Sequence, residues 1–346
     1  MEYVKLGSSG LEVSPIAVGC LTFGEPDRGH PTWSLDEDAS RPLIRHAIEA
    51  GVNFFDTANM YSNGSSEEIL GRALRDYGDR DALVIASKIR HEMRSGPNAD
   101  GLSRKTIMTE VEHSLRRLGT DYIDLYQVHR IDRSVPWEET LEALHDLVKA
   151  GKVRYLGASS MRAWEFAKAL RLQRENGWAR FVSMQDHYNL LQREEEREMV
   201  PLCLDEGVGT LVWSPLARGR LARAWDESKA TARGQRDEYA DILYGSLTEE
   251  SDRAIIDAVG RVAERRGLPR AQVALAWLHA QPVVTAPVVG VSRVSQLDDA
   301  IASIDVRLDA DEIAELQRDY TPRHDFQAAD EKELMASLPQ FALDKR

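Results

Sequence analysis

Short apolar runs alternate with amphipathic segments along most of this chain. The runs are rich in β-branched and aromatic residues, whereas the segments between them repeat apolar residues at helical spacing. Continuous apolar runs are typical of strands buried on both faces, as in a parallel sheet covered by helices. The predicted strands are 16–19, 52–55, 83–87, 122–128, 153–156, 181–184, 210–213 and 283–286.

The predicted helices begin and end at residues with known capping chemistry. Gly51, Gly119 and Gly207 directly follow helical segments, where a left-handed residue can close a helix. Ser103 stands at a helix start, where its hydroxyl can accept a backbone N–H, and Pro269 suits a first helical turn. The predicted helices are 36–50, 66–77, 103–118, 137–150, 163–175, 194–206, 249–266, 269–280, 295–302 and 309–320.

Two features favour a closed barrel over an open doubly wound sheet. The first seven strands recur about 30 to 40 residues apart without an intervening linker, and no G-x-G-x-x-G motif follows any strand. Segments 3–6 and 11–14 predict a small hairpin before the first strand. We therefore expect an α/β fold, a (β/α)8 TIM barrel with an N-terminal β-hairpin and a long loop after strand seven. Residues 1–346 would form a single domain, with 321–346 as a C-terminal tail.

Composition restricts the partners and the compartment. Lys and Arg number 44 against 57 Asp and Glu, and the net charge of −13 disfavours nucleic acid or anionic membrane as partners. Cys20 and Cys203 are the only cysteines, which is typical of a reducing compartment. No signal-peptide pattern and no apolar run of membrane-spanning length is found in the sequence. We expect a cytoplasmic protein.

Polar residues directly follow several predicted strands, and in a barrel these positions meet at one mouth. Asp56 ends the second strand and Tyr61 lies in the loop beyond it, while Lys88 and His129 follow the third and fourth strands. Taken alone, Asp56 could cap a turn and Tyr61 could pack on the surface. Because buried charge is costly unless it is paired, four such groups on neighbouring strands favour a functional role.

These four side chains have the chemistry to protonate a carbonyl oxygen. A free tyrosine titrates near pH 10, and an adjacent Lys88 ammonium should lower the pKa of Tyr61. Asp56 can keep Lys88 charged, and neutral His129 can donate a hydrogen bond to a carbonyl oxygen. A metal centre is disfavoured because H-E-x-x-H and paired cysteines are absent. Residues 157–161, Gly-Ala-Ser-Ser-Met, lack the second glycine of a hydrolase nucleophile elbow.

The ordered motifs resemble those of the aldo-keto reductase family. Each motif is weak alone, but the set follows the family's order and spacing from about residue 6 to residue 320. Within the family, the chain is most similar to the aryl-alcohol-dehydrogenase-type members, which are related to the β subunits of voltage-gated potassium channels. The resemblance implies a catalytic tetrad of Asp56, Tyr61, Lys88 and His129, with Tyr61 as general acid and base. The motifs are Phe-Asp-Thr-Ala at 55–58 with Tyr61, Ser-Lys at 87–88, Val-His at 128–129, Gly-Ala-Ser-Ser at 157–160, Ser-Met-Gln at 183–185 and Trp-Ser-Pro-Leu at 213–216.

The resemblance also implies a site for NADP(H). Ser159, Ser160 and Gln185 would bind the carboxamide of the nicotinamide. Trp213 would stack on the nicotinamide ring, a role that suits a flat apolar face. The resemblance places a phosphate loop after strand seven, where Ser214, Leu216, Gly219 and Arg220 would run under the pyrophosphate, and an adenosine-phosphate segment at residues 290–300. The cofactor-binding residues predicted in this way are Cys20, Leu21, Ser159, Ser160, Gln185, Trp213, Ser214, Pro215, Leu216, Gly219, Arg220, Gly290, Ser292, Arg293, Gln296 and Asp299.

Arginines after strand seven gather positive charge in an acidic chain, as a dinucleotide requires, although a solvated basic loop is the open alternative. The chain departs from the family at Ala300, where Asn is common, at Gln296, where a basic residue is frequent, and at Asp186, where Asn is frequent. The preference for NADP over NAD therefore rests on Ser292, Arg293 and these arginines. The arginines are Arg218, Arg220, Arg223, Arg233 and Arg236.

We expect an enzyme that reduces an aldehyde or ketone to an alcohol, reversibly, with a hydride from NAD(P)H and a proton from Tyr61. The alternative is a cofactor-binding, redox-sensing regulatory subunit with vestigial reductase activity. The four intact ionisable residues favour the enzyme. The small-molecule carbonyl substrate depends on loops over the mouth. Trp33, His91 and Arg130 could line the pocket or simply pack those loops, and the oligomeric state is not determined by the sequence.

Overall fold

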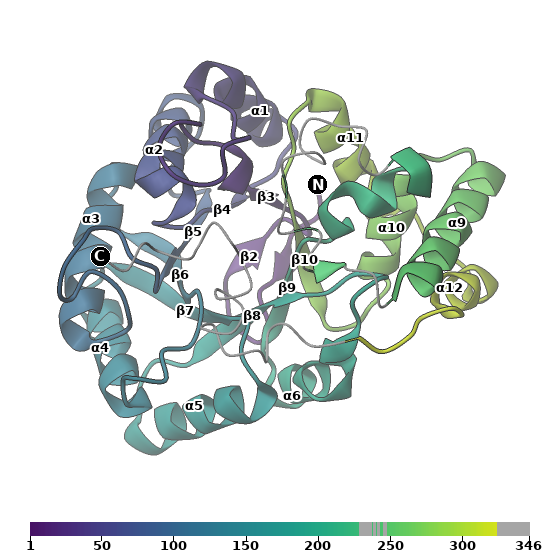
Figure 1. The fold of residues 1–346 in the computed structure, drawn as a ribbon. Helices are drawn as coiled ribbons and strands as arrows, with labels where there is room; N and C mark the ends of the chain where they lie inside the picture. Colours follow the sequence, from purple (N-terminus) through teal and green to yellow (C-terminus); the bar gives the residue numbers. More distant parts are fainter. Residues whose placement is uncertain (228–236, 238–239, 241–242, 245–247, 324–346) are drawn as a thin grey trace.

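Eight parallel strands close into a barrel with helices around the outside (Figure 1). The computed structural model describes residues 1–227, 237, 240, 243–244 and 248–323. Around the barrel the strands follow the order β10-β3-β4-β5-β6-β7-β8-β9, which confirms the predicted TIM barrel. The strands are β3 Ala17–Gly19, β4 Phe54–Asp56, β5 Val84–Ile89, β6 Ile123–Val128, β7 Val153–Ser159, β8 Phe181–His187, β9 Gly209–Trp213 and β10 Val284–Val289.

The helices cover the outer face of the barrel, and their ends follow the capping chemistry of the sequence. The Ser103 hydroxyl accepts the Thr106 N–H at 3.2 Å, and Gly119 closes the same helix with a φ of 65°. No helix in the described ranges is long and apolar enough to cross a bilayer. The helices are α1 Glu37–Glu49, α2 Ser65–Tyr77, α3 Arg104–Leu118, α4 Trp137–Lys149, α5 Ala163–Asn176, α6 Met199–Glu206, α9 Glu249–Arg266, α10 Arg270–His279, α11 Val294–Ala302 and α12 Ala310–Gln317.

The prediction of one helix over 194–206 is wrong. The structure has a 3-10 turn, η3 (Glu194–Arg197), followed by α6, and Glu198 between them has a φ of −143°. Pro201 explains the break, because it has no N–H to donate to the Arg197 carbonyl and its ring would clash there. In the first turn of α6 the same proline is tolerated.

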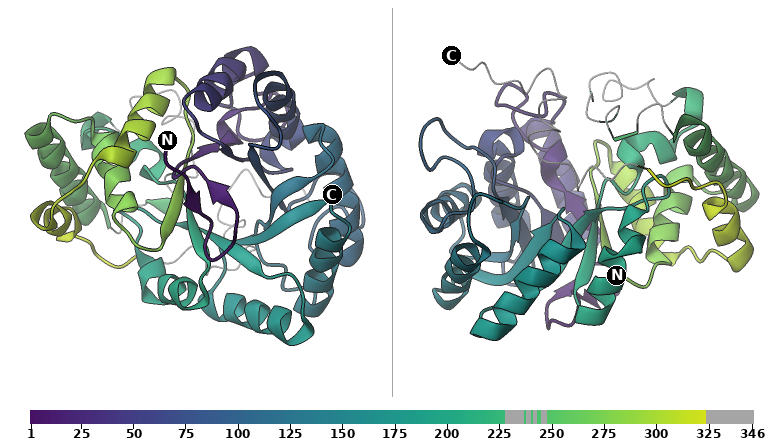
Figure 2. Two further views of the ribbon diagram at one scale, coloured as in Figure 1. Left: turned by 180° about the vertical axis from the view of Figure 1, so that it is seen from behind. Right: turned by 60° about the horizontal axis from the view of Figure 1, so that its bottom comes forward.

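An N-terminal hairpin closes the end of the barrel opposite the mouth. Its strands β1 (Val4–Lys5) and β2 (Glu12–Val13) pair antiparallel, as predicted, and the left view of Figure 2 shows the hairpin across the barrel. Ser8 N donates to Gly207 O at 2.8 Å, just before β9 begins. Leu6 and Val13 are fully buried against the apolar side chains that fill the barrel interior. Those side chains are Ala17, Phe54, Val84, Ala86, Leu125, Leu211, Ala286 and Val288.

Several strands run further than their apolar patterns predicted. In the ladder between β5 and β6, Lys88 pairs with Gln127, and in the ladder between β7 and β8, Ser159 pairs with Gln185. The backbone therefore remains in the sheet through the polar positions, although the side chains there no longer match a buried strand. These registers place the predicted site residues of neighbouring strands side by side.

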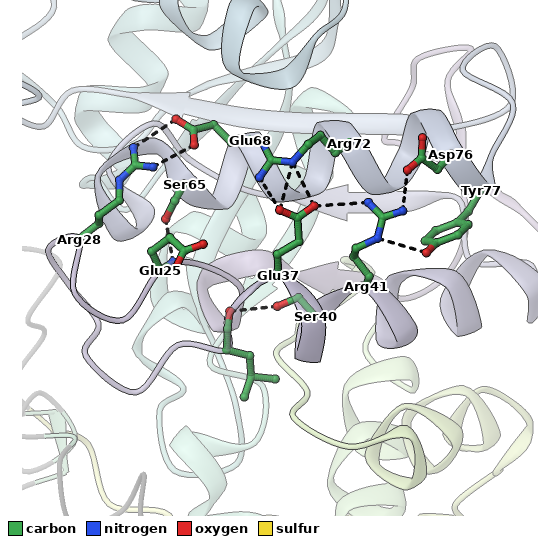
Figure 3. Close-up of polar contacts among 11 residues, drawn as sticks. Glu25, Arg28, Glu37, Ser40, Arg41, Ser65, Glu68, Arg72, Asp76 and Tyr77 are labelled. Carbon is green, nitrogen blue, oxygen red and sulfur yellow. Dashed lines mark hydrogen bonds and ion pairs between the residues drawn. The ribbon is translucent and has the colours of Figure 1, made fainter.

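Ion pairs on the surface attach α1 and the loop before it to α2. Figure 3 shows Glu37 between Arg72, at 2.7 Å, and Arg41, at 3.4 Å. Arg28 reaches across from the preceding loop to Glu68 of α2 at 2.9 Å. The loop between β3 and α1 is thus held against the helix that follows Tyr61.

The single-domain assignment of 1–346 stays a prediction. The barrel strands run from Ala17 to Val289. Of the predicted tail 321–346, only residues up to Arg323 are described, and Arg233 and Arg236 of the predicted basic loop also lie outside the described residues.

Candidate active site

The four residues predicted to be catalytic meet at the carboxyl ends of β4, β5 and β6. Asp56 ends β4, Lys88 lies near the end of β5, His129 follows β6, and Tyr61 opens the short turn η2 (Tyr61–Gly64). Asp56 and Lys88 are 2% and 0% exposed, whereas Tyr61 and His129 retain partial exposure. A buried ion pair therefore lies beneath two groups that can meet a ligand.

The Lys88 ammonium uses its three donors within the protein. It donates to Asp56 Oδ1 in a short ion pair, to Thr57 O at 2.9 Å and to Tyr61 Oη at 3.2 Å. Burial is the largest single influence and acts to lower the pKa of Lys88. The Asp56 carboxylate and Tyr61 together outweigh it, so that the pKa of Lys88 is raised. Lys88 is a cation at neutral pH.

The pKa of Tyr61 is raised, so the predicted net lowering is wrong, although Lys88 itself acts to lower this pKa as predicted. Burial is the largest influence and raises the pKa. Lys88 lowers the pKa, but the Asp56 carboxylate opposes it. The ammonium is half of an ion pair and does not act on the phenol as an isolated charge. Tyr61 is consequently protonated at neutral pH, which is the form that can donate a proton.

His129 is held in its neutral form. Its ring lies edge-on to Tyr61, with centroids 5.8 Å apart, and edge-on to His91 at 4.8 Å. Burial lowers the pKa of His129 well below its usual value, and His91, Lys88 and Arg130 lower it further. Burial likewise lowers the pKa of His91 to about 3. A neutral imidazole retains one ring N–H that can donate to a carbonyl oxygen.

Two glutamine amides hold the other oxygen of Asp56. Gln127 Nε2 donates to Asp56 Oδ2 at 2.9 Å, and Gln185 Nε2 donates to the same oxygen at 2.8 Å. The sequence motifs predict that Gln185 binds the cofactor, whereas Gln127 is not among the residues that they predict for the site. The available signal was a polar residue two positions before His129 in an apolar strand, since alternate strand residues share a face.

The predicted nicotinamide residues lie together across β7, β8 and β9. Ser159 Oγ donates to Gln185 O at 2.8 Å, and Trp213 Nε1 donates to Ser160 Oγ at 3.0 Å. Ser160 and Ser214 have φ values of 52° and 55°, a left-handed backbone that non-glycine residues adopt at a cost of about 1 to 3 kcal/mol. Such strain is concentrated at functional sites, and here it shapes the two turns beside Trp213.

A histidine that the sequence analysis missed fixes the plane of Trp213. The rings of His187 and Trp213 stack with centroids 4.1 Å apart and planes 13° from parallel. His187 Nε2 lies 2.7 Å from Tyr244 Oη, and Asn189 Nδ2 donates to both Tyr244 Oη and Ser214 O at 2.9 Å. The ring face that Trp213 would offer to a nicotinamide is therefore the one opposite His187.

The predicted phosphate loop follows β9 directly. Pro215 is buried, while Leu216, Gly219 and Arg220 are partly exposed in the turn that includes η4 (Ala217–Ala222). Arg220 lies over the Tyr244 ring, with its Cζ 5.5 Å from the ring centroid.

The predicted basic patch is less positive than the sequence suggested. Arg218 makes a two-pronged ion pair with Asp237, at 2.6 and 2.7 Å. That pair offsets one of the charges counted toward a phosphate site, because the carboxylate lies directly against the guanidinium.

The predicted adenosine-phosphate segment continues from β10. Gly290, Ser292 and Arg293 are exposed there. Gln296 Oε1 accepts from Ser292 N at 2.8 Å and from Ser292 Oγ at 3.2 Å, so that this side chain shapes the turn. Asp299 Oδ1 accepts from Gln272 Nε2 at 2.9 Å.

Cys20 and Leu21 lie beside that segment, because β3 pairs with β10. Cys20 is buried and Leu21 is partly exposed. A Cβ at Gly290 would come within 2.7 Å of the Thr22 hydroxyl, which shows how closely the two segments approach.

Asp186 does not alter the charge at the mouth. It is buried in β8 next to Gln185, and successive strand residues point to opposite faces. Burial and, after it, the Asp186 carboxylate raise the pKa of Cys203 in α6. This departure from the family pattern therefore acts on the helix side of the strand.

The fold and the site together define an oxidoreductase built on a (β/α)8 barrel. The sequence model described as "Aldo/keto reductase family" matches residues 15–320. The chain is 45% identical over 341 residues to versiconal hemiacetal acetate reductase of Aspergillus parasiticus, covering 93% of this chain and 98% of that protein. It is 44% identical over 342 residues to aldo-keto reductase AFTS1 of Alternaria alternata, covering 92% and 91%.

A third relative supports the predicted branch. The chain is 40% identical over 344 residues to a Schizosaccharomyces pombe protein provisionally named an aryl-alcohol dehydrogenase, covering 92% of this chain and 96% of that protein. The chain belongs to the aldo/keto reductase family. Membership implies a nicotinamide cofactor and a small carbonyl substrate.

Proposed function

We propose that this protein reduces an aldehyde or ketone to an alcohol with NADPH, reversibly, and that Tyr61 supplies the proton. The observation that carries the proposal is the chain of contacts from Asp56 through Lys88 to Tyr61, in which the Lys88 ammonium lies 3.2 Å from the phenol oxygen. The protonated phenol and the neutral His129 meet at a partly exposed mouth, so a carbonyl oxygen can reach both.

The residues present fit a nicotinamide dinucleotide. The indole of Trp213 offers a flat face, and the strained turns at Ser160 and Ser214 bring polar groups to its edge. Exposed Arg293 and partly exposed Arg220 offer positive charge to the cofactor's phosphates, and this supports NADP over NAD because NADP carries one more phosphate. When bound, the cofactor supplies the hydride.

Each member of the tetrad has a separate task in the proposed reaction. The His129 N–H orients the carbonyl oxygen, and Tyr61 Oη transfers its proton to that oxygen as hydride arrives at carbon. The phenolate that remains is stabilised by the Lys88 ammonium, which Asp56 keeps charged. In the oxidation of an alcohol the proton returns to Tyr61.

The names of the relatives support the proposed reaction, and the state of the two cysteines supports the expected location. The relatives are named as reductases and as an alcohol dehydrogenase, which act between carbonyl and alcohol. Cys20 and Cys203 are both buried free thiols, which supports a reducing, cytoplasmic location.

Tyr61→Phe tests the proposal. Removal of the proton donor should lower kcat for a reactive aromatic aldehyde by at least about 100-fold, the usual contribution of a general acid. NADPH binding, measured by tryptophan fluorescence, should be unchanged because the phenol is not among the predicted cofactor contacts. Tyr3→Phe is the matched control, since Tyr3 lies 46% exposed beside the hairpin at the far end of the barrel.

Undiminished turnover in Tyr61→Phe would end the proposed mechanism. Turnover of the unaltered protein that is orders of magnitude below that of an ordinary enzyme, together with tight retention of NADPH, would favour the regulatory-subunit alternative.

A further inference from the structure

We propose that Arg130 binds the substrate and selects carbonyl compounds that carry a carboxylate. The inference rests on the proposed reductase function and names a substrate class for it. Arg130 follows His129 at the end of β6 and is partly exposed at the mouth.

The guanidinium of Arg130 lies between the two halves of the site. Its Nη1 donates to Ser160 O at 3.5 Å, and its Cζ lies 5.8 Å from the centroid of the Trp213 ring. Its charge contributes to the lowered pKa values of His91, His129 and His187, which is consistent with a position close to these three rings. The guanidinium therefore lies next to both His129, its neighbour in the chain, and Trp213, the predicted partner of the nicotinamide ring.

Among the described residues, Arg130 differs from Arg90 and Arg133 in having no carboxylate beside it. Within the described ranges, no carboxylate oxygen lies within 4.0 Å of the Arg130 guanidinium. By contrast, Arg90 pairs with Asp100 at 3.4 Å, and Arg133 pairs with Glu165 at 2.9 Å. A guanidinium carries five N–H donors, and one long bond to a carbonyl leaves most of them for a ligand.

The predicted phosphate sites of the cofactor do not include Arg130. The predicted phosphate contacts lie after Trp213, at 214–220, and after β10, whereas the Arg130 guanidinium lies beside Trp213 itself, where the nicotinamide ring and not a phosphate is predicted to stack. The anion that meets Arg130 therefore belongs to the substrate. A carboxylate matches the planar fork of a guanidinium and can accept two parallel hydrogen bonds from it.

The test compares aldehydes that differ only in charge. The probes are 2-, 3- and 4-carboxybenzaldehyde and their methyl esters, with saturating NADPH, and the readout is kcat/KM for each acid divided by that for its ester. The unaltered protein should prefer at least one acid isomer. Arg130→Met should lower that ratio by about 10- to 100-fold, the effect of losing a hydrogen bond to a charged group. Arg130→Lys should restore part of it, because lysine keeps the charge but lacks the fork.

Arg133→Met is the matched control, since this arginine lies on the same loop but is neutralised by Glu165. It should leave the ratio unchanged. If Arg130 only packs against Trp213, Arg130→Met will change kcat/KM for acids and esters by the same factor. The acid-to-ester ratio will then be unchanged, which will overturn the inference. Weaker NADPH binding with an unchanged ratio will overturn it too, by assigning Arg130 to the cofactor. Reduction of esters without any acid preference removes this inference alone, whereas failure to reduce any aldehyde removes the reductase function beneath it.

Discussion

At the scale of residues, the buried carboxylate of Asp56 organises the site. Asp56 accepts from Lys88 on one oxygen and from Gln127 and Gln185 on the other, so that donors from three strands converge on it. The attraction within a buried ion pair offsets the cost of removing the charges from water only if the remaining hydrogen-bonding capacity is satisfied. The two amides meet that condition. Because one of these amides belongs to Gln185, Asp56 is also connected to a residue that is predicted to contact the cofactor.

Gln127→Leu should therefore weaken catalysis without touching the reacting atoms. Loss of one charge-assisted bond to Asp56 costs about 1.5 to 3 kcal/mol, and we expect kcat to fall by about tenfold with NADPH affinity retained. Steady-state kinetics and fluorescence titration measure the two effects. Gln127→Glu keeps the shape but places a second carboxylate beside Asp56, so it should be more harmful than Gln127→Leu. Equal activity in all three proteins would show that Gln127 does not position Asp56.

Ion pairs join elements in two different settings. The network around Glu37 in Figure 3 ties α1 to α2 at the surface, where water and salt screen it. Glu67 of α2 is instead fully buried, accepting from Ser87 Oγ at 2.5 Å and from Arg117 Nε at 2.6 Å. Because Ser87 precedes Lys88, this buried contact joins α2 and α3 to the strand that carries the ammonium.

Glu67→Gln and Glu37→Gln should differ in stability because of that difference in burial. Removal of one partner of a buried pair costs about 3 kcal/mol, whereas a surface pair contributes less than about 1 kcal/mol. Urea unfolding should show a large loss for Glu67→Gln and a small, salt-sensitive loss for Glu37→Gln. Similar losses for both variants would contradict the distinction.

The whole molecule carries several histidines that burial keeps neutral. Burial lowers the pKa of His91 to about 3 and that of His279 to about 4, and it lowers those of His129 and His187 well below their usual value. Their unfolded-state value is about 6.5. Between these values the unfolded chain binds more protons than the folded chain, so stability is complete above about pH 6.5 and falls as the pH falls.

His279→Gln isolates one of these contributions. Between pH 6.5 and about pH 4, the slope of the unfolding free energy against pH should fall by about 1.4 kcal/mol per pH unit. This is the slope that one proton bound on unfolding contributes. Urea unfolding at several pH values measures the slope. His30→Gln, in an exposed loop, is the control. An unchanged slope in His279→Gln would show that this histidine is not held neutral in the folded state.

Local sequence predicted most of the elements, and its errors have identifiable causes. The helix predicted over 194–206 is broken at Glu198, and the signal, Pro201, was present in the sequence but was overridden by the apolar periodicity. Strands ended too early because the apolar pattern stops at Lys88 and Gln185 while the backbone ladder continues. The errors in the strands are errors of boundary, because hydrogen bonding to a neighbouring strand does not depend on side-chain polarity.

By itself, the sequence determined the alternation of strands and helices, the residue types at the strand ends and the family, because these depend on patterns within a few turns of chain. The tertiary structure decided which charges meet. It paired Arg218 with Asp237 but left Arg130 beside neutral rings, and it raised the pKa of Tyr61 where sequence predicted the opposite. Desolvation and Coulomb interaction depend on distances between residues far apart in the chain, and only the closed barrel sets those distances.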